Sequence, residues 1–252
     1  HDINVIQEKQ QEILNVVIKE LSSRMGGLAD NLLVQEVVHS VVGYMLKEKR
    51  GGKLIKQFTK TLIHNTESLS FNQREIKDCI AVLAYAGLIS FCDKFNFQTN
   101  SKSINERIYF NDLGLLSYCL SVDDYLQSDV DGILAENFVF KTLNEPSSYC
   151  KFRVLRPQFG VFNDGELDFT IVSALDNKRY VIEVKSGKNQ VNTGNKLLEQ
   201  GRVDFLVIYK GIMQESVAEQ KMVLPIWLSP LFQYDCYKNA DNDKSDMLMN
   251  LF

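Results

Sequence analysis

Two short segments of this sequence place charged side chains within runs of strand-forming residues. In residues 165–169, Glu166 and Asp168 alternate with apolar residues, and in the following segment Glu183 and Lys185 do the same. Because successive side chains of a strand point to opposite faces, we expect the charged residues to share one face and the apolar residues the other. A tight turn between the segments would make them a hairpin that brings Asp168 beside Glu183.

This arrangement predicts a divalent metal site. Two neighbouring carboxylates repel, which raises the pKa of one of them unless a cation neutralises the pair. All three histidines precede residue 70 and the five cysteines contain no C-x-x-C pair, so oxygen ligands are expected. Such ligands favour Mg²⁺ or Mn²⁺. Lys185 would then stand near the attacking water and the scissile phosphate. The simpler alternative is that these charges keep an edge strand soluble, since E-x-K recurs by chance.

The elements that must position this hairpin alternate between helix and strand. Periodicity predicts helices over 133–143 and within 188–200. It predicts strands over 152–157, 166–172, 180–185 and 205–209, with a turn-rich link over 159–165. The order α-βββ-α-β predicts a small sheet with helices on its faces, in an α/β or α+β fold.

The first third of the chain is expected to be helical, with helices around residues 13–21 and 32–46. Ser70 and Gln73 form an S-x-x-Q capping box that opens another helix, and Gly87 is placed to end it. Strand-like residues follow on both sides of a polar loop at 98–103. Helix, strand, hairpin and strand is the order of a winged helix; the alternative is a helical bundle with an incidental hairpin.

The basic residues expected to contact nucleic acid lie in three places. Arg74 and Lys77 are on the exposed side of the expected recognition helix, Lys53 and Lys56 belong to a basic cluster before it, and Lys188 follows the E-x-K segment. The alternative is a solvated helix face, and winged helices also bind proteins.

The acidic motifs together resemble the PD-(D/E)xK nuclease superfamily. The resemblance rests on Glu136 in the expected helix and on the segments 165–169 and 182–188. More narrowly, the chain resembles, from about 57 to 228, the restriction-endonuclease-like domain at the C-terminus of many predicted prokaryotic AAA+ ATPases. Residues 109–115 are similar to the junction motif of that family.

The resemblance implies a role for each matched residue. Asp168 and Glu183 would ligate the metal, and Glu136 would complete or orient the site. Lys185 would stabilise the attacking water or the pentacovalent phosphate, and Glu166 would lie beside the site. Members of this superfamily include binding modules with intact-looking pockets, so the motif implies the fold more firmly than cleavage.

The expected organisation is a helical, winged-helix-like domain at 1–124, a nuclease-like domain at 125–234 and a tail at 235–252. The expected function is that of a Mg²⁺-dependent nuclease module of an AAA+ ATPase, which hydrolyses phosphodiester bonds. The alternative is a non-catalytic DNA- or protein-binding regulatory module. The sequence lacks G-x-x-x-x-G-K-[ST] and begins with His1, so we expect a piece of a longer polypeptide without its ATPase domain.

Composition excludes several classes of protein. With 252 residues, 45% of them hydrophobic and 24% charged, the chain is neither disordered nor a disulfide scaffold. No apolar run approaches the roughly 18–20 residues of a membrane span, and we expect a cytoplasmic protein. Residues 1–100 hold 12 basic and 11 acidic side chains, and residues 101–252 hold 16 and 21. The N-terminal part is therefore the better candidate to face DNA, the expected partner; self-association is left open.

Overall fold

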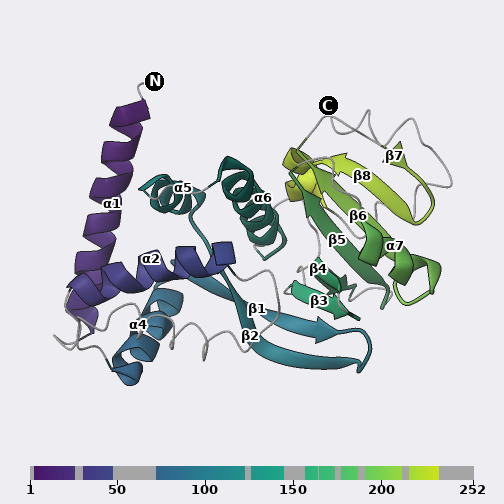
Figure 1. Ribbon diagram of the computed structural model, residues 1–252, viewed down its shortest axis with the longest axis horizontal. Helices are drawn as coiled ribbons and strands as arrows, with labels where there is room; N and C mark the ends of the chain where they lie inside the picture. Colours follow the sequence, from purple (N-terminus) through teal and green to yellow (C-terminus); the bar gives the residue numbers. More distant parts are fainter. Residues whose placement is uncertain are drawn as a thin grey trace. The chain divides into compact units, whose positions relative to one another are not determined.

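The computed structural model describes residues 3–25, 31–47, 72–122, 126–144, 157–163, 165–173, 177–186, 191–211 and 216–232 (Figure 1). Within these residues the fold is mixed α+β, with six α-helices and one eight-stranded mixed sheet. No helix in these ranges is both long enough and apolar enough to cross a membrane.

The chain divides into two compact units. Unit 1 comprises His1–Cys92 and Ile104–Asn137, and unit 2 comprises Asp93–Ser103 and Phe138–Phe252. This division differs from the expected single boundary near residue 125. The boundary falls inside a helix, and the tip of the hairpin belongs to unit 2 although its base belongs to unit 1.

The helices before and after the hairpin form the body of unit 1. The elements that contribute to this unit are α1 (Ile3–Arg24), α2 (Asn31–Lys47), α4 (Gln73–Tyr85), α5 (Leu113–Val122), the first part of α6 (Gln127–Asn144) and the bases of β1 (Ile89–Asn96) and β2 (Ser101–Phe110). Helix α1 packs against α2 and α5, and α2 packs against α4 and α5. Leucine, isoleucine and valine side chains from these helices fill one core.

The ends of α4 show how local sequence sets a helix boundary. The capping box is real but is formed by Asn72 and Glu75, so the prediction that Ser70 and Gln73 form it is wrong. The Asn72 carboxamide accepts hydrogen bonds from the backbone N–H groups of Arg74 and Glu75, each at 3.0 Å. At the other end, Gly87 has φ +75°, as predicted for a helix-ending glycine.

One buried amide joins α6 to the end of β2 within unit 1. Asn137 is fully buried, donates to the carbonyl of Phe110 at 2.6 Å and accepts from its N–H at 2.9 Å. A carboxamide can satisfy both groups of a backbone residue in this way. The strand end is therefore tied to the helix without leaving a buried polar group unpaired.

Unit 2 is built around the sheet that carries the acidic motifs. Its elements are β3 (Gln158–Phe162), β4 (Gly165–Val172), β5 (Arg179–Lys185), α7 (Asn192–Glu199), β6 (Phe205–Lys210), β7 (Ser216–Val217), β8 (Lys221–Pro225) and a 3₁₀ helix at Ile226–Leu231. The sheet order is β2-β1-β3-β4-β5-β6-β8-β7. Strands β3, β4 and β5 are antiparallel neighbours, whereas β5, β6 and β8 run parallel. Helix α7 packs against β4, β5 and β6 (Figure 1).

Several sequence predictions differ from these elements. The link expected at 159–165 is largely strand β3, because its residues pair with β4. The strand expected over 152–157 lies almost wholly outside the described residues, as does the tail 235–252. Strands β7 and β8 were not predicted.

The tip of the hairpin is fixed within unit 2. Residues 93–96 of β1 pair in parallel with β3, and the Arg179 guanidinium lies 4.0 Å from the centre of the Phe95 ring. Arg202 donates to the carbonyl of Phe97 at 2.9 Å. In the sheet, β1 has neighbours on both sides, β2 and β3, and is next to the edge strand β2.

Candidate functional site

The predicted cluster of charges forms on two adjacent strands of unit 2. Strands β4 and β5 are antiparallel, with Phe169 opposite Ile182, so the next position in the same register sets Asp168 against Glu183. Residues 180–184 of β5 are all buried, and the β-branched and aromatic ones among them favour the strand. Glu183 is thus an acid inside a strand that is otherwise held by its apolar side chains.

The three side chains meet as the sequence predicts. The Lys185 ammonium lies 2.8 Å from Oε2 of Glu183 and 3.4 Å from Oδ2 of Asp168. The same Asp168 oxygen accepts a 2.6 Å hydrogen bond from the backbone N–H of Val184. Side chains of Asp168 and Lys185 are each 20% exposed and that of Glu183 is 4% exposed. Solvent therefore reaches the cluster from the Asp168 and Lys185 side.

The strand alternation around Asp168 differs from the prediction. Leu167 and Phe169 were expected to pack on one face, but Leu167 joins an apolar cluster with Leu197 of α7, whereas Phe169 lies against Phe140 of α6. The register between β3 and β4 shifts by one residue at this point. Such irregularities redirect side chains in a strand, and this one falls at the acidic residue.

Electrostatics set the ionisation of the cluster. Burial, and then the charge of Asp168, raise the pKa of Glu183 from 4.5 to about 8, although Lys185 opposes the shift. Burial alone would lower the pKa of Lys185, but the two carboxylates outweigh it and raise that pKa. Lys185 is therefore charged at neutral pH, and one ammonium does not fully compensate two carboxylates in this setting.

The donor set suits a hard cation only in part. Asp168 and Glu183 offer carboxylate oxygens at a partly open site, and burial together with the charge of Asp168 raises the pKa of Glu183 there. Among the described residues, however, no three His, Cys, Asp or Glu side chains are grouped so that they could hold a metal ion. The two acids fit a divalent ion that completes its shell with water or substrate oxygens.

Glu136, predicted to complete the site, has partners of its own in unit 1. Its Oε1 accepts a 2.7 Å hydrogen bond from the Tyr109 hydroxyl and a 3.2 Å bond from Arg107. The neighbouring Glu136 carboxylate adds to the effect of burial in raising the pKa of Tyr109. No pattern in the sequence indicates these partners, and the role of Glu136 at the metal site stays a prediction.

The start of α7 closes one side of the cluster. A Cβ added at Gly194 would lie 3.4 Å from Oε1 of Glu183 and 2.9 Å from a methyl group of Leu206. A Cβ at Gly165, at the start of β4, would collide with the Thr193 side chain. Both glycines permit a close approach between α7 and the strands that carry the acids.

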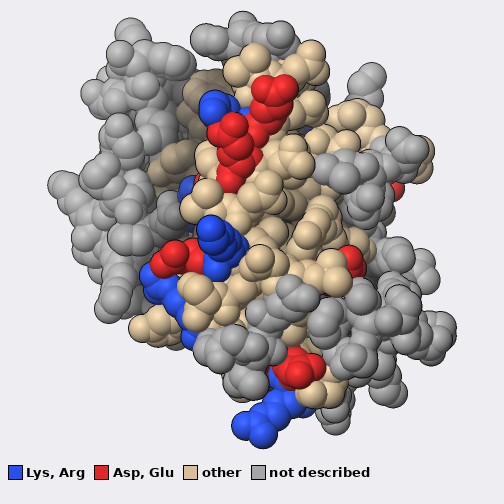
Figure 2. All heavy atoms as spheres, turned by 90° about the vertical axis from the view of Figure 1, so that its left-hand side faces the viewer, with Lys and Arg blue, Asp and Glu red and all other residues tan. Residues whose placement is uncertain are grey.

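The residues predicted to bind nucleic acid are only partly described. Arg74 and Lys77 are exposed on α4 in unit 1, and Arg74 lies 3.8 Å from Asp78 on the same helix. Lys53, Lys56 and Lys188 lie outside the described residues. On the face drawn in Figure 2, basic and acidic side chains of the described residues are interspersed rather than gathered into one basic patch.

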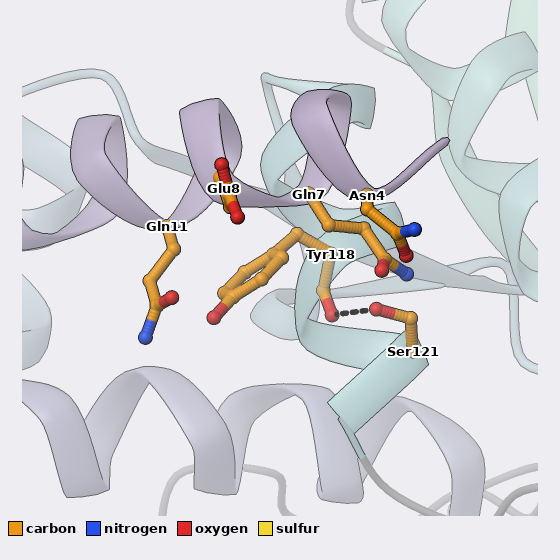
Figure 3. Close-up of a pocket in the computed structure, with 6 residues that line it drawn as sticks. All are labelled: Asn4, Gln7, Glu8, Gln11, Tyr118 and Ser121. Atoms are coloured by element: carbon orange, nitrogen blue, oxygen red, sulfur yellow. Dashed lines mark hydrogen bonds between the residues drawn. The ribbon is translucent and has the colours of Figure 1, made fainter. Parts of the chain in front are cut away.

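A second feature, a polar hollow of about 440 Å³, lies between α1 and α5 in unit 1 (Figure 3). It is lined by Asn4, Gln7, Glu8, Gln11, Tyr118 and Ser121. In Figure 3 the side chains of Gln7 and Gln11 extend from α1 on either side of the Tyr118 ring. None of these residues stands out in the sequence, since amides at helical spacing are typical of a solvated helix face.

Comparison with known proteins adds no relative to this description. No protein-family model, curated protein or solved structure matches the chain. The resemblance to the PD-(D/E)xK superfamily therefore stays a prediction that rests on the motif residues.

Proposed function

We propose that unit 2 hydrolyses phosphodiester bonds in nucleic acid with the help of Mg²⁺ or Mn²⁺. The observation that carries the proposal is the convergence of Asp168, Glu183 and Lys185, with the ammonium 2.8 Å and 3.4 Å from the two carboxylates. Two acids that could hold a divalent cation, and a lysine that could stabilise phosphoryl oxygens, meet at a partly open strand hairpin and suit this reaction.

Each residue has a distinct task in this proposal. Asp168 and Glu183 would hold the cation, which would polarise the phosphate and activate water. The Val184 N–H fixes the Asp168 carboxylate through its 2.6 Å hydrogen bond. Lys185 presents positive charge where the phosphoryl oxygens become more negative. The water oxygen forms a bond to phosphorus, the bond to one ester oxygen breaks, and that oxygen receives a proton from the water.

Plasmid nicking tests the proposal. Purified protein is incubated with supercoiled plasmid and Mn²⁺ or Mg²⁺, and Asp168→Asn and Lys185→Met are compared with the wild type. We expect each variant to lose about 100-fold or more of the nicking rate, as for other groups that act on the reacting atoms. Glu199→Gln and Lys196→Met change exposed residues of α7 and serve as matched controls that retain activity.

Metal binding is tested separately from nicking. Isothermal calorimetry with Mn²⁺ should detect binding to the wild type and to Lys185→Met but not to Asp168→Asn. Circular dichroism of each variant establishes that it is folded. If the wild type neither nicks DNA nor binds Mn²⁺, the hydrolytic proposal is rejected.

A second function is favoured by a specific feature of the same cluster. Lys185 already partly neutralises both acids, and the described residues supply no third ligand. This balance suits a non-catalytic DNA- or protein-binding module of an AAA+ ATPase. DNA binding without nicking would support it, and Arg74→Glu/Lys77→Glu should then weaken a gel shift, because the Arg74 side chain is 91% exposed on α4. Unchanged DNA affinity in that variant would remove α4 from the interface.

A further inference from the structure

A second lysine lies beside Lys185 where two strands of unit 2 end. Strands β5 and β6 run parallel, and their register sets Lys185 opposite Lys210, which is the last residue of β6 as Lys185 is of β5. Neighbouring strands of a sheet are about 4.8 Å apart, so the backbone brings the two lysines next to each other. Lys210 belongs to none of the acidic motifs, and its place beside Lys185 depends on the pairing of the strands.

The side chain of Lys210 extends on the same face of the sheet as the acidic cluster. Ile208, two positions before it, packs in the apolar cluster that contains Leu197 of α7. Since alternate residues of a strand share a face, Lys210 is on the face that α7 covers. Glu183 is on that face too, because a Cβ added at Gly194 of α7 would lie 3.4 Å from its Oε1.

The backbone that carries Lys210 is held on both sides. The N–H of Gly211 donates to the carbonyl of Lys185 at 3.1 Å, which continues the contact between the two strands beyond their last residues. A Cβ at Gly211 would lie 3.1 Å from the carbonyl oxygen of Ser186, so glycine permits this close approach. On its other side Lys210 pairs with Pro225 of β8. The direction of the Lys210 side chain is therefore set by three strands.

The charges at this edge suit an anionic ligand once a divalent cation is bound. Asp168, Glu183 and the two lysines have formal charges that cancel when all four are ionised. Mg²⁺ or Mn²⁺ at the two acids would bring the sum to two positive charges. Like charges on neighbouring strands repel each other, and an anion that contacts both ammonium groups relieves this repulsion. The backbone of a nucleic acid supplies one negative charge for each nucleotide.

We propose that Lys210 binds a backbone phosphate of the nucleic-acid substrate, next to the phosphate that is hydrolysed. This inference rests on the proposed hydrolysis and adds a substrate contact outside the acidic motifs. Lys185 acts where charge develops during the reaction, whereas Lys210 contacts a phosphate whose charge stays the same. Lys210 is thus a substrate-binding residue, which strengthens binding of the ground state and of the transition state alike.

DNA binding without divalent metal tests this contact apart from hydrolysis. The full chain is titrated into a short fluorescein-labelled DNA duplex, and fluorescence anisotropy gives Kd at several salt concentrations. Loss of one phosphate contact makes the dependence of log Kd on log salt concentration less steep by about 0.9. We therefore expect Lys210→Met to bind about 5–10-fold more weakly than the wild type at about 100 mM salt. Between about 50 and about 200 mM salt, the variant should lose about threefold less affinity than the wild type.

Two further variants control for the loss of charge and for folding. Lys196→Met removes the same charge from an exposed position of α7 and should bind DNA as the wild type does. Lys210→Arg keeps the charge and should retain both the affinity and the salt dependence. Circular dichroism of each variant establishes that it is folded. A lysine that only stabilised the sheet would lower the free energy of unfolding when replaced and leave the salt dependence of binding unchanged.

Nicking kinetics with Mn²⁺ separate the two lysines. Lys210→Met should raise KM about 5–10-fold and change kcat by less than about threefold, because the contact is present before and during the reaction. Lys185→Met should instead lower kcat, since its contact strengthens only in the transition state.

The outcomes distinguish this proposal from the proposed hydrolysis. A wild type that does not bind DNA, or a folded Lys210→Met with the affinity and salt dependence of the wild type, would overturn the phosphate contact. So would a loss of kcat at unchanged KM in Lys210→Met, or a Lys196→Met that binds as weakly as Lys210→Met. If the wild type binds DNA without nicking it and Lys210→Met binds more weakly, hydrolysis is rejected and the phosphate contact of Lys210 is supported.

Discussion

The buried Glu183 should make the stability of the protein fall as the pH rises through the neutral range. In the folded chain its pKa is about 8, against an ordinary value of 4.5, because burial and Asp168 disfavour the carboxylate. Between these two values the unfolded chain releases a proton that the folded chain keeps. Stability from this group is therefore fully present below pH 4.5 and lost as the pH rises through about 8.

Glu183→Gln isolates the effect, because its amide stays neutral and its oxygen can still accept from Lys185. One pKa unit corresponds to about 1.4 kcal/mol. The free energy of unfolding of the variant minus that of the wild type should thus increase with pH. Relative to its value at acidic pH, this difference should be larger by about 2 kcal/mol at pH 6 and by up to about 4–5 kcal/mol above pH 8. Only the change of this difference with pH tests the reasoning, because its value at any single pH also includes the effect of replacing the carboxyl group by an amide.

Urea unfolding at pH 5, 6, 7, 8 and 9, followed by circular dichroism, measures this difference. Glu199→Gln, at an exposed position of α7, controls for the loss of one acidic group and should differ from the wild type by a constant amount. A difference between Glu183→Gln and the wild type that stays flat from pH 5 to 9 would refute the reasoning. Mn²⁺ should stabilise the wild type more at pH 8 than at pH 6, because the ion replaces the proton.

The remaining predictions concern stability and use the same urea assay. Asn137→Leu should cost about 2–4 kcal/mol, because it leaves the buried N–H and C=O of Phe110 without their partner; a cost below 1 kcal/mol would contradict this. Gly160→Ala should cost about 1–3 kcal/mol, since its Cβ would lie 2.9 Å from a methyl group of Leu167; an unchanged midpoint would show that the strand adjusts freely. Asn72→Ala removes the N-cap of α4 and should lower the free energy of unfolding by about 1 kcal/mol; an unchanged free energy of unfolding would show that the cap contributes little to stability.

The position of Lys185 bears on both proposed functions. An ammonium between two carboxylates occupies the place that a divalent cation would take, so metal entry requires that Lys185 move outward. Substitution of this lysine is therefore expected to separate two properties, because metal affinity is retained or improved while hydrolysis is lost. A purely structural lysine would show neither pattern.

The sequence by itself determined the local parts of this protein. Period-two alternation located β4 and β5, and the i, i+2 spacing alone places Glu183 and Lys185 on one face. Gly87 was predicted to end α4 because helices commonly end at a residue in the left-handed conformation, which glycine adopts most easily. These features depend on a few neighbouring residues, so the chain contains all the information for them. The cap of α4 was missed by two residues, because Ser70 and Asn72 are both good caps and only the folded helix chooses between them.

Only the tertiary structure decided how distant segments use these parts. The register shift that separates Leu167 from Phe169 arises where β4 pairs with β3, and the pKa of Glu183 depends on burial that several strands create together. Likewise, the partners of Glu136 are Tyr109 and Arg107 of β2, which lie 27 and 29 residues earlier in the chain. Pairing across such distances is governed by packing and desolvation of the whole unit, and no short stretch of sequence encodes either one.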